Sequence, residues 1–323
     1  MQFTIYKSTD ASAPTLNGNA GSLITVLDAI LVNGYGSKAA AGWTKAFSGT
    51  NKAAYRQGGG NSFYLRVQDD APLSGRDARC TGYESMSDVD TGTGTFPTAA
   101  QVSTGLLCRK STTADSTARA WICFADDRTF YLFTDSGDRA TQYHQLFFGD
   151  FYSVVPSDAY RTMIMGNPAE VAGANNGCPC DRLNGDTNDV SSVSGSYMAR
   201  GYSGTASSVA AGRFGGSQYG GFGNQTYMAG TIAFPNPADG GIYLSAIWLW
   251  DYTTSGLKTI RGRLRGLWHF GHTAASINDR DTMSGVGDLS GKSFMFLKHG
   301  CTGGGTLGTV FSIETSNTLE TNS

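Results

Sequence analysis

Glutamate and lysine are scarce in this chain of 323 residues, which contains 4 Glu and 8 Lys beside 22 Asp and 16 Arg. Both scarce residues are strong helix formers, so their near absence argues against a helical bundle, a coiled coil or a regular α/β barrel. Long apolar runs are also lacking. The longest, Ile242–Trp250, covers nine residues, whereas a membrane-spanning helix needs about 20.

The first residues, Met1–Ser8, lack the basic segment and following apolar core of a secretory signal peptide. We therefore expect a soluble protein made in the cytosol, with no membrane partner. The formal net charge is −2 at pH 7. Because proteins that wrap nucleic acid are usually basic, no nucleic-acid partner is expected either.

The cysteines do not indicate a disulfide framework, because disulfides are rare in proteins that are not exported. The six are Cys80, Cys108, Cys123, Cys178, Cys180 and Cys301. Cys123 lies in an apolar run and is expected to be buried. One residue separates Cys178 from Cys180, unlike the C-x-x-C spacing of redox and zinc sites, so a loop pair is favoured over a metal or redox site.

Residues that favour turns and strands are abundant. The chain contains 44 Gly, 32 Ser and 34 Thr, together with 17 Phe, 15 Tyr and 5 Trp. Apolar residues recur on one helical face at 22–33, with Ser22 as the expected N-cap and Gly34 after the end. The sequence therefore predicts a mainly β fold of sandwich-like or jelly-roll-like sheets. One N-terminal helix packs on a sheet, and the loops are long and glycine-rich.

Aromatic and β-branched runs between turn residues predict the individual strands. These runs span 3–7, 42–47, 52–57, 62–68, 78–86, 118–124, 129–134, 144–155, 227–234, 241–252, 258–270, 293–298 and 309–314. Residues 97–107 are ambiguous, with a short helix as one alternative. We predict an N-terminal α+β domain at 1–112 and a C-terminal β domain at 113–323, with Gly-, Ser- and Asn-rich loops at 171–225.

Motifs that resemble ligand sites are incomplete. Gly291-Lys292-Ser293 ends like a phosphate-binding loop, but Val286 stands where that loop needs glycine. His269 and His272 lack a third metal ligand and are better explained as structural histidines. Residues 184–188 alternate like calcium ligands without the required glycine and glutamate, so calcium binding there is the less favoured reading.

Hydrolytic chemistry is not indicated. The sequence has no Gly-x-Ser-x-Gly motif. The pairs Asp69/Asp70 and Asp126/Asp127 are adjacent, whereas a glycosidase needs two facing carboxylates roughly 5–9 Å apart. Neighbouring strand residues point in opposite directions, so turn and cap roles explain these pairs better. We expect no enzymatic activity, no catalytic residue, no cofactor and no metal.

Two sets of residues are candidates for contacts with other molecules. The first contains aromatic residues in glycine-rich sequence, which suit protein contacts or sugar stacking as well as packing on their own domain: Tyr202, Phe214, Tyr219 and Phe222. The second contains arginines at a spacing of two: Arg261, Arg263 and Arg265. A solvated strand face or a network with aspartates is favoured over a phosphate contact for these arginines.

Several segments carry a family resemblance. They are Phe3–Asp10 with Pro14, Gly21–Leu23, Leu27–Gly34, Trp43, Tyr55–Gln57, Phe63–Asp70, Phe148–Asp150 and Ile260–Trp268. Through them most of the chain resembles virion structural proteins of tailed bacteriophages. The resemblance implies a location in the virion and other virion proteins as partners, and it supplies no catalytic residues.

We accordingly expect a non-enzymatic accessory protein at the tail or neck of the particle. It is expected to form a homo-oligomer, with a trimer favoured, because symmetric assembly stabilises such components. A capsid-decorating (cement) protein or head fibre is one alternative. A carbohydrate-binding module that recognises a glycan on the host surface is the other.

Overall fold

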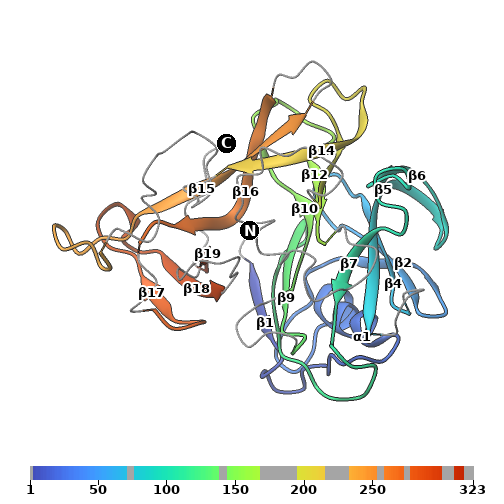
Figure 1. Cartoon of the computed structure of the whole chain (residues 1–323), viewed down its shortest axis with the longest axis horizontal. Coiled ribbons are helices and arrows are strands. Elements are labelled where there is room, and N and C mark those ends of the chain that lie inside the picture. The colour runs from blue at the N-terminus through green and yellow to red at the C-terminus, as the bar shows by residue number, and fades with distance from the viewer. Residues whose placement is uncertain are drawn as a thin grey trace.

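The computed structural model describes residues 3–70, 76–137, 144–167, 195–214, 233–252, 258–272, 277–299 and 309–315. In these residues the protein is mostly β, and every strand pairing is antiparallel (Figure 1). One short α-helix lies near the N-terminus. The predicted β-rich class is therefore confirmed.

The predicted helix at 22–33 is present in two parts. Helix α1 (Ser22–Leu27) continues into the π-helical turn η1 (Asp28–Asn33), which ends at Gly34 with a φ of 75°. The expected N-cap was wrong: the hydroxyl of Ser22 donates to Asn17 O. The carboxylate of Asp69 instead accepts from the amides of Leu23, at 2.7 Å, and Ile24, at 3.3 Å. A residue distant in sequence thus supplies the cap that the local pattern assigned to serine.

The smaller sheet has six strands in the described part of the chain. They are β2 (Thr44–Gly49), β3 (Lys52–Arg56), β4 (Tyr64–Gln68), β5 (Asp77–Asp88), β6 (Thr91–Phe96) and β7 (Leu106–Arg109). Their order is β2-β3-β4-β5-β6, and β7 pairs with a second stretch of β5. The ambiguous segment 97–107 forms turns that lead into β7 and contains no helix.

The larger sheet has thirteen described strands. In spatial order they are β1 (Thr4–Lys7), β8 (Trp121–Ala125), β9 (Thr129–Thr134), β10 (His144–Asp150), β12 (Thr162–Met165), β13 (Ser196–Arg200), β14 (Ser207–Phe214), β15 (Leu244–Tyr252), β16 (Lys258–Phe270), β19 (Thr309–Glu314), β18 (Ser293–His299) and β17 (Thr282–Ser284). The remaining strand, β11 (Tyr152–Ser153), pairs with β16.

Strand β11 gives this sheet an unusual connectivity. It follows β10 after one residue, Phe151, and pairs with β16. The pairings β10-β12-β13-β14-β15-β16 therefore return to the β10–β11 segment and form a closed circuit. Buried side chains from these strands, including Phe147, Met163, Leu249 and Leu264, pack together in one apolar cluster.

The two sheets share a second core. Helix residues such as Leu27 pack with Leu65 of β4 and with Trp121 and Phe130 of the larger sheet. The indole of Trp43, just before β2, lies 5.8 Å from the ring of Phe130. A third cluster, which contains Phe270, Phe294 and Phe296, lies at the end of the molecule away from the smaller sheet (Figure 1).

The predicted division at residues 112 and 113 stays a prediction. Strand β1, from the N-terminal side, pairs with β8 from the C-terminal side, with Tyr6 opposite Cys123. None of the described helices is both long and apolar enough to span a membrane.

Candidate functional site

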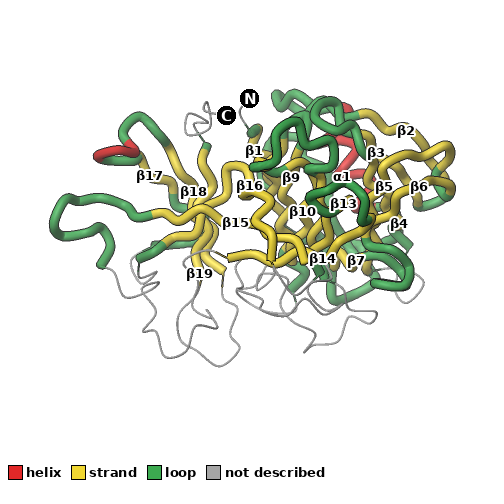
Figure 2. The backbone as a smooth tube through the Cα atoms, turned by 90° about the horizontal axis from the view of Figure 1, so that it is seen from above, coloured by secondary structure: helices red, strands yellow, loops and turns green. Residues whose placement is uncertain are grey.

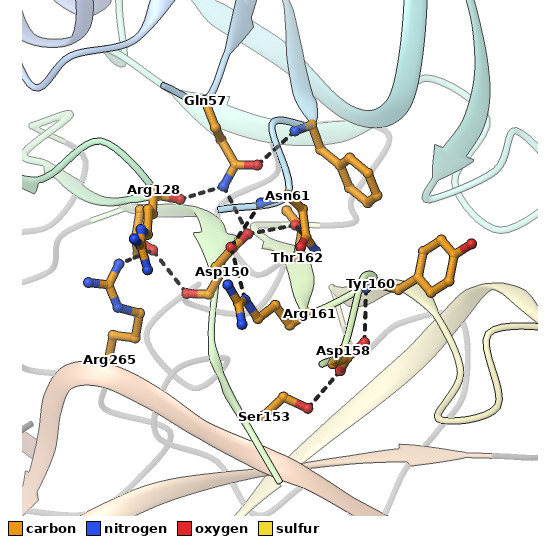
Figure 3. A network of polar contacts seen from close by, with 12 residues as sticks. Gln57, Asn61, Arg128, Asp150, Ser153, Asp158, Tyr160, Arg161, Thr162 and Arg265 are labelled. Atoms are coloured by element: carbon orange, nitrogen blue, oxygen red, sulfur yellow. Dashed lines mark hydrogen bonds and ion pairs between the residues drawn. The ribbon is translucent and has the colours of Figure 1, made fainter. Parts of the chain in front are cut away.

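Asp150, at the end of β10, binds the β3–β4 hairpin to the larger sheet (Figure 3). Its side chain accepts hydrogen bonds from Gln57 Nε2 at 3.0 Å, Asn61 N at 3.2 Å and Thr162 Oγ1 at 2.7 Å. Arg161 Nε lies 3.3 Å from Oδ2. Because Asp150 is only 1% exposed, these donors compensate for the loss of water around its charge.

Arg265, in β16, pairs with Asp126 in the turn between β8 and β9. Its Nη2 lies 2.7 Å from Asp126 Oδ2, and its Nη1 lies 3.2 Å from Oδ1 and 3.0 Å from Thr129 Oγ1. Burial alone would lower the pKa of the Arg265 guanidinium, but the charge of Asp126 raises that pKa overall. The Arg265 guanidinium therefore stays charged within the fold.

Arg261 is fully buried and binds two carboxylates. Its Nη2 lies 2.6 Å from Asp158 Oδ2, and its Nη1 lies 3.3 Å from Asp251 Oδ2. It also donates to Arg200 O at 2.7 Å. Arg261 and Arg265 thus form the arginine–aspartate network that the sequence favoured over a phosphate contact. Their predicted role in contacts with other molecules stays a prediction.

The other predicted contact residues lie in different surroundings. The guanidinium of Arg263 lies 5.3 Å from the ring of Tyr152 and 5.7 Å from that of Trp268. Tyr202, in the turn between β13 and β14, is 50% exposed. Phe214 ends β14, where its backbone pairs with Trp248, and nothing is described of its side chain. Tyr219 and Phe222 lie outside the described residues.

The described cysteines are buried free thiols: Cys80, Cys108 and Cys123. Burial raises the pKa of all three, that of Cys108 to about 12. They behave as small apolar residues, as predicted for Cys123. Cys178, Cys180 and Cys301 lie outside the described part of the chain.

Asp69 and Asp126 have structural roles, as the sequence favoured. Asp69 caps α1, and its Oδ1 lies 2.5 Å from Lys110 Nζ in a fully buried pair. Asp126 also accepts from the amides of Arg128 and Thr129, each at 2.9 Å, within its turn. No group of three or more metal-ligating side chains occurs in the described residues, which exclude 184–188.

A groove of about 360 Å³ lies at the end of the molecule that contains β15 to β18. The segment before β15 and the turn that contains the 3₁₀-helix η2 (Gly287–Leu289) both project at this end (Figure 2). Tyr243, Trp268, Val286 and Leu289 contribute apolar surface, and Asp239 contributes a carboxylate. Tyr243 is 49% exposed and Val286 is 39% exposed, so the groove displays large apolar side chains to solvent.

The imidazole of His272 holds the backbone of Tyr243, which lines the groove, close to the backbone of Ala233. Its Nε2 accepts from the amide of Tyr243 at 2.6 Å, and its Nδ1 lies 2.7 Å from Ala233 O. Because Nε2 accepts, the hydrogen bond to the carbonyl assigns the ring proton to Nδ1. His272 is therefore a structural histidine, as expected. Nothing is described of the His269 side chain.

The polar end of the groove is a short hydrogen-bonded chain. Asp239 Oδ1 accepts from Asn236 Nδ2 at 2.5 Å and Gly241 N at 2.8 Å, and Oδ2 accepts from Tyr243 Oη at 3.0 Å. The Gly241 amide lowers the pKa of Asp239, and Asn236 adds to this effect. The hydrogen bond to Asp239 raises the pKa of Tyr243. The groove thus holds a carboxylate acceptor beside a neutral phenol.

The sequence did not indicate this groove. The expected strands at 241–252 and 258–270 contain Tyr243 and Trp268, but Asp239 and Val286 lie in loops. The only local signal was the turn-forming Asp239-Gly240-Gly241 before an aromatic run.

No protein-family model matches the chain, and no curated protein matches its sequence. Function is therefore inferred from the site and from the surface of the fold.

Proposed function

We propose that the protein is a non-enzymatic structural component of a tailed-phage virion, an oligomeric accessory protein attached at the tail or neck. The resemblance of its sequence segments to virion structural proteins supports this role. A capsid-decorating protein or head fibre is the alternative. We favour the tail or neck because 323 residues exceed what a minimal cement protein needs.

The observation that carries this proposal is that Arg261 and Arg265 form ion pairs inside the fold. Arg261 and Arg265 neutralise buried aspartates and fix neighbouring strands, which suits a rigid building block. Two residues with exposed apolar side chains, Val154 and Tyr202, have backbone amides bound next to Arg261. Val154 N donates to Arg261 O at 2.8 Å, and Tyr202 N donates at 2.7 Å to the Asp251 carboxylate that Arg261 binds.

We assign the contact between copies to this surface, defined by Val154, Tyr202 and Ile260, which are 55%, 50% and 47% exposed. Large exposed apolar side chains are more common at protein interfaces than elsewhere on a surface, and these three belong to neighbouring stretches of backbone. We further propose that the sheets have a sandwich-like or jelly-roll-like arrangement. The prediction of loops throughout 171–225 was wrong at Ser196–Arg200 and Ser207–Phe214, which form β13 and β14. We propose that this region contacts neighbouring copies or other virion proteins.

Size-exclusion chromatography with multi-angle light scattering of the purified protein at micromolar concentration tests the self-contact. We expect an oligomer, with a trimer favoured, that Ile260→Asp converts to monomer because the new charge would be buried at the interface. Val286→Asp, which adds the same charge in the distal groove, is the matched control and should leave the oligomer intact. A monomeric wild-type protein at micromolar concentration would contradict the assignment.

Quantitative mass spectrometry of purified phage particles tests the location. A low copy number, consistent with tail or neck symmetry, is expected. Hundreds of copies per particle would instead favour capsid decoration, and absence of the protein from particles would overturn the virion role.

A further inference from the structure

We propose that the distal groove binds a neutral pyranose ring, with Tyr243 as the stacking surface and Asp239 as the acceptor for sugar hydroxyls. This inference is independent of where the protein sits in a virion, and it gives a specific site to carbohydrate recognition.

The ring of Tyr243 is exposed yet held in place. Its amide donates to His272, its hydroxyl donates to Asp239, and its ring lies 5.7 Å from the His272 ring. The His272 ring in turn lies 5.0 Å from the ring of Phe270, which belongs to the apolar cluster with Phe294 and Phe296. A fixed aromatic face attracts the weakly positive C–H bonds on one side of a sugar ring, and little entropy is lost when the sugar binds.

The carboxylate of Asp239 has capacity left for a ligand. Its Oδ1 already accepts two hydrogen bonds, whereas Oδ2 accepts one, from Tyr243, among the described residues. A carboxylate oxygen can accept two, so Oδ2 can take a sugar hydroxyl. Such a hydrogen bond to a charged acceptor is stronger than one between neutral groups.

The charges beside the groove select against ionic ligands. The guanidinium of Arg263 lies 5.7 Å from the Trp268 ring, so a cationic ligand on that ring would meet a like charge. Asp239, at the polar end, repels an anion in the same way. A neutral polyol is repelled neither by the guanidinium of Arg263 nor by the carboxylate of Asp239.

Trp268, in the wall of the groove, carries an indole N–H that can donate a hydrogen bond. Trp268 Nε1 is buried and has no hydrogen-bond partner among the residues that the structure describes. Trp268 itself lines the groove, and a ligand oxygen would satisfy this donor where the ligand displaces the atoms that cover it. The volume of about 360 Å³ is at the lower end of the range for ligand sites, roughly 300–1,000 Å³, and suits one or two sugar rings.

Saturation-transfer difference NMR on the full chain tests the proposal. The probes are the methyl α- and β-pyranosides of glucose, galactose, mannose and N-acetylglucosamine, with choline chloride as a cationic probe. We expect at least one pyranoside to receive saturation on one face of its ring. Asp239→Asn should weaken this binding about tenfold, and Tyr243→Ala should abolish it.

Two further variants keep the test decisive. Tyr243→Phe retains the ring and should bind more tightly than Tyr243→Ala, which a merely structural role of the hydroxyl would not produce. Ile260→Asp, on the proposed self-contact surface, should bind as the wild type does, so loss of assembly and loss of sugar binding can be told apart. Circular dichroism verifies that each variant folds.

The proposal is overturned if no pyranoside binds the wild-type protein, or if binding survives Tyr243→Ala. Binding of choline without any pyranoside would also overturn it, because the ligand would then be a cation.

Discussion

At the scale of single residues, the Arg265–Asp126 pair is the contact that we expect to matter most for stability. Arg265→Met leaves Asp126 buried without its partner, so the free energy of unfolding should fall by about 3–5 kcal/mol. Urea unfolding followed by tryptophan fluorescence measures the change. The matched control is Lys52→Met, which removes a partly exposed partner of Asp90 and should cost less than about 1 kcal/mol.

The same pair allows a stricter test. Replacing both residues with apolar ones, Arg265→Met with Asp126→Leu, removes the unpaired charge and should recover part of the lost stability. If the double variant is as unstable as the sum of both single variants, the hydrogen bonds of Asp126 within its turn matter more than the ion pair.

The buried thiols make a second prediction at this scale. Because burial raises the pKa of Cys108 to about 12, the reactive thiolate is almost absent at pH 8. Iodoacetamide should therefore leave Cys80, Cys108 and Cys123 unmodified in the native protein and label them in urea, as read by peptide mass spectrometry. Labelling of these three at pH 8 in the native state would show that the core between the sheets opens readily.

At the scale of elements, the β3–β4 hairpin depends on a glycine. Gly60 has a φ of +65°, and an added Cβ would lie 2.0 Å from Asp150 Oδ2. Gly60→Ala should therefore lower stability by about 2–3 kcal/mol, from backbone strain and the displaced carboxylate. Gly240, at +68°, has no atom within 4 Å of such a Cβ, so Gly240→Ala should cost only about 1 kcal/mol.

Chemical denaturation of the two glycine variants gives the comparison directly. Equal losses would mean that the backbone conformation alone accounts for the effect. Asp150 would then have room to move without breaking its contact with the hairpin.

The groove at the distal end should bind its sugar independently of pH in mildly alkaline solution. The lowered pKa of Asp239 keeps the acceptor charged below the usual aspartate value of about 3.9, and the raised pKa of Tyr243 keeps the phenol neutral up to its usual value of about 10. Affinity measured by titration NMR should thus be constant from about pH 7.5 to pH 9, above the usual titration range of histidine, so that His272 stays an acceptor for the Tyr243 amide. A midpoint within this interval would implicate a different titrating group.

The elements themselves were largely predictable, because aromatic and β-branched runs between turns identify strands without knowledge of the fold. The 118–124 and 129–134 runs pair as β8 and β9, and the 52–57 and 62–68 runs pair as β3 and β4. Strands β6, β12, β13, β14 and β17 were not predicted. Of these, β6 was missed because it alternates threonine with glycine. Gly92 and Gly94 are needed there, since a Cβ would meet Tyr83 and Glu84 at about 2.5 Å.

The distal groove was not predictable for a different reason. Asp239, Trp268 and Val286 come from three separate segments, and only the pairing of β15 with β16 and the turn before β18 bring them together. The sequence predicts Tyr243 only as part of a strand at 241–252, and the pattern of residues along a strand does not determine how exposed this side chain is.

At the scale of the whole molecule, the shared core predicts a single cooperative unfolding transition. Leu65 and Val67 of the smaller sheet pack in one cluster with Trp121 and Leu132 of the larger sheet. Circular dichroism and tryptophan fluorescence should therefore give the same midpoint in urea. Two separate midpoints would mean that the sheets unfold independently, and would support a domain boundary near residue 112.

The long-range pairings also determine when the fold can be completed during translation. Asp126 can form its ion pair only after Arg265, 139 residues later, has been synthesised. Likewise, β11 can pair only after β16 has been synthesised, and this pairing closes the circuit of strands. A chain released from the ribosome before β16 would retain a buried, unpaired carboxylate and open strand edges, which proteases and chaperones recognise. A prematurely terminated chain would therefore be recognised and degraded instead of accumulating in a partly folded form.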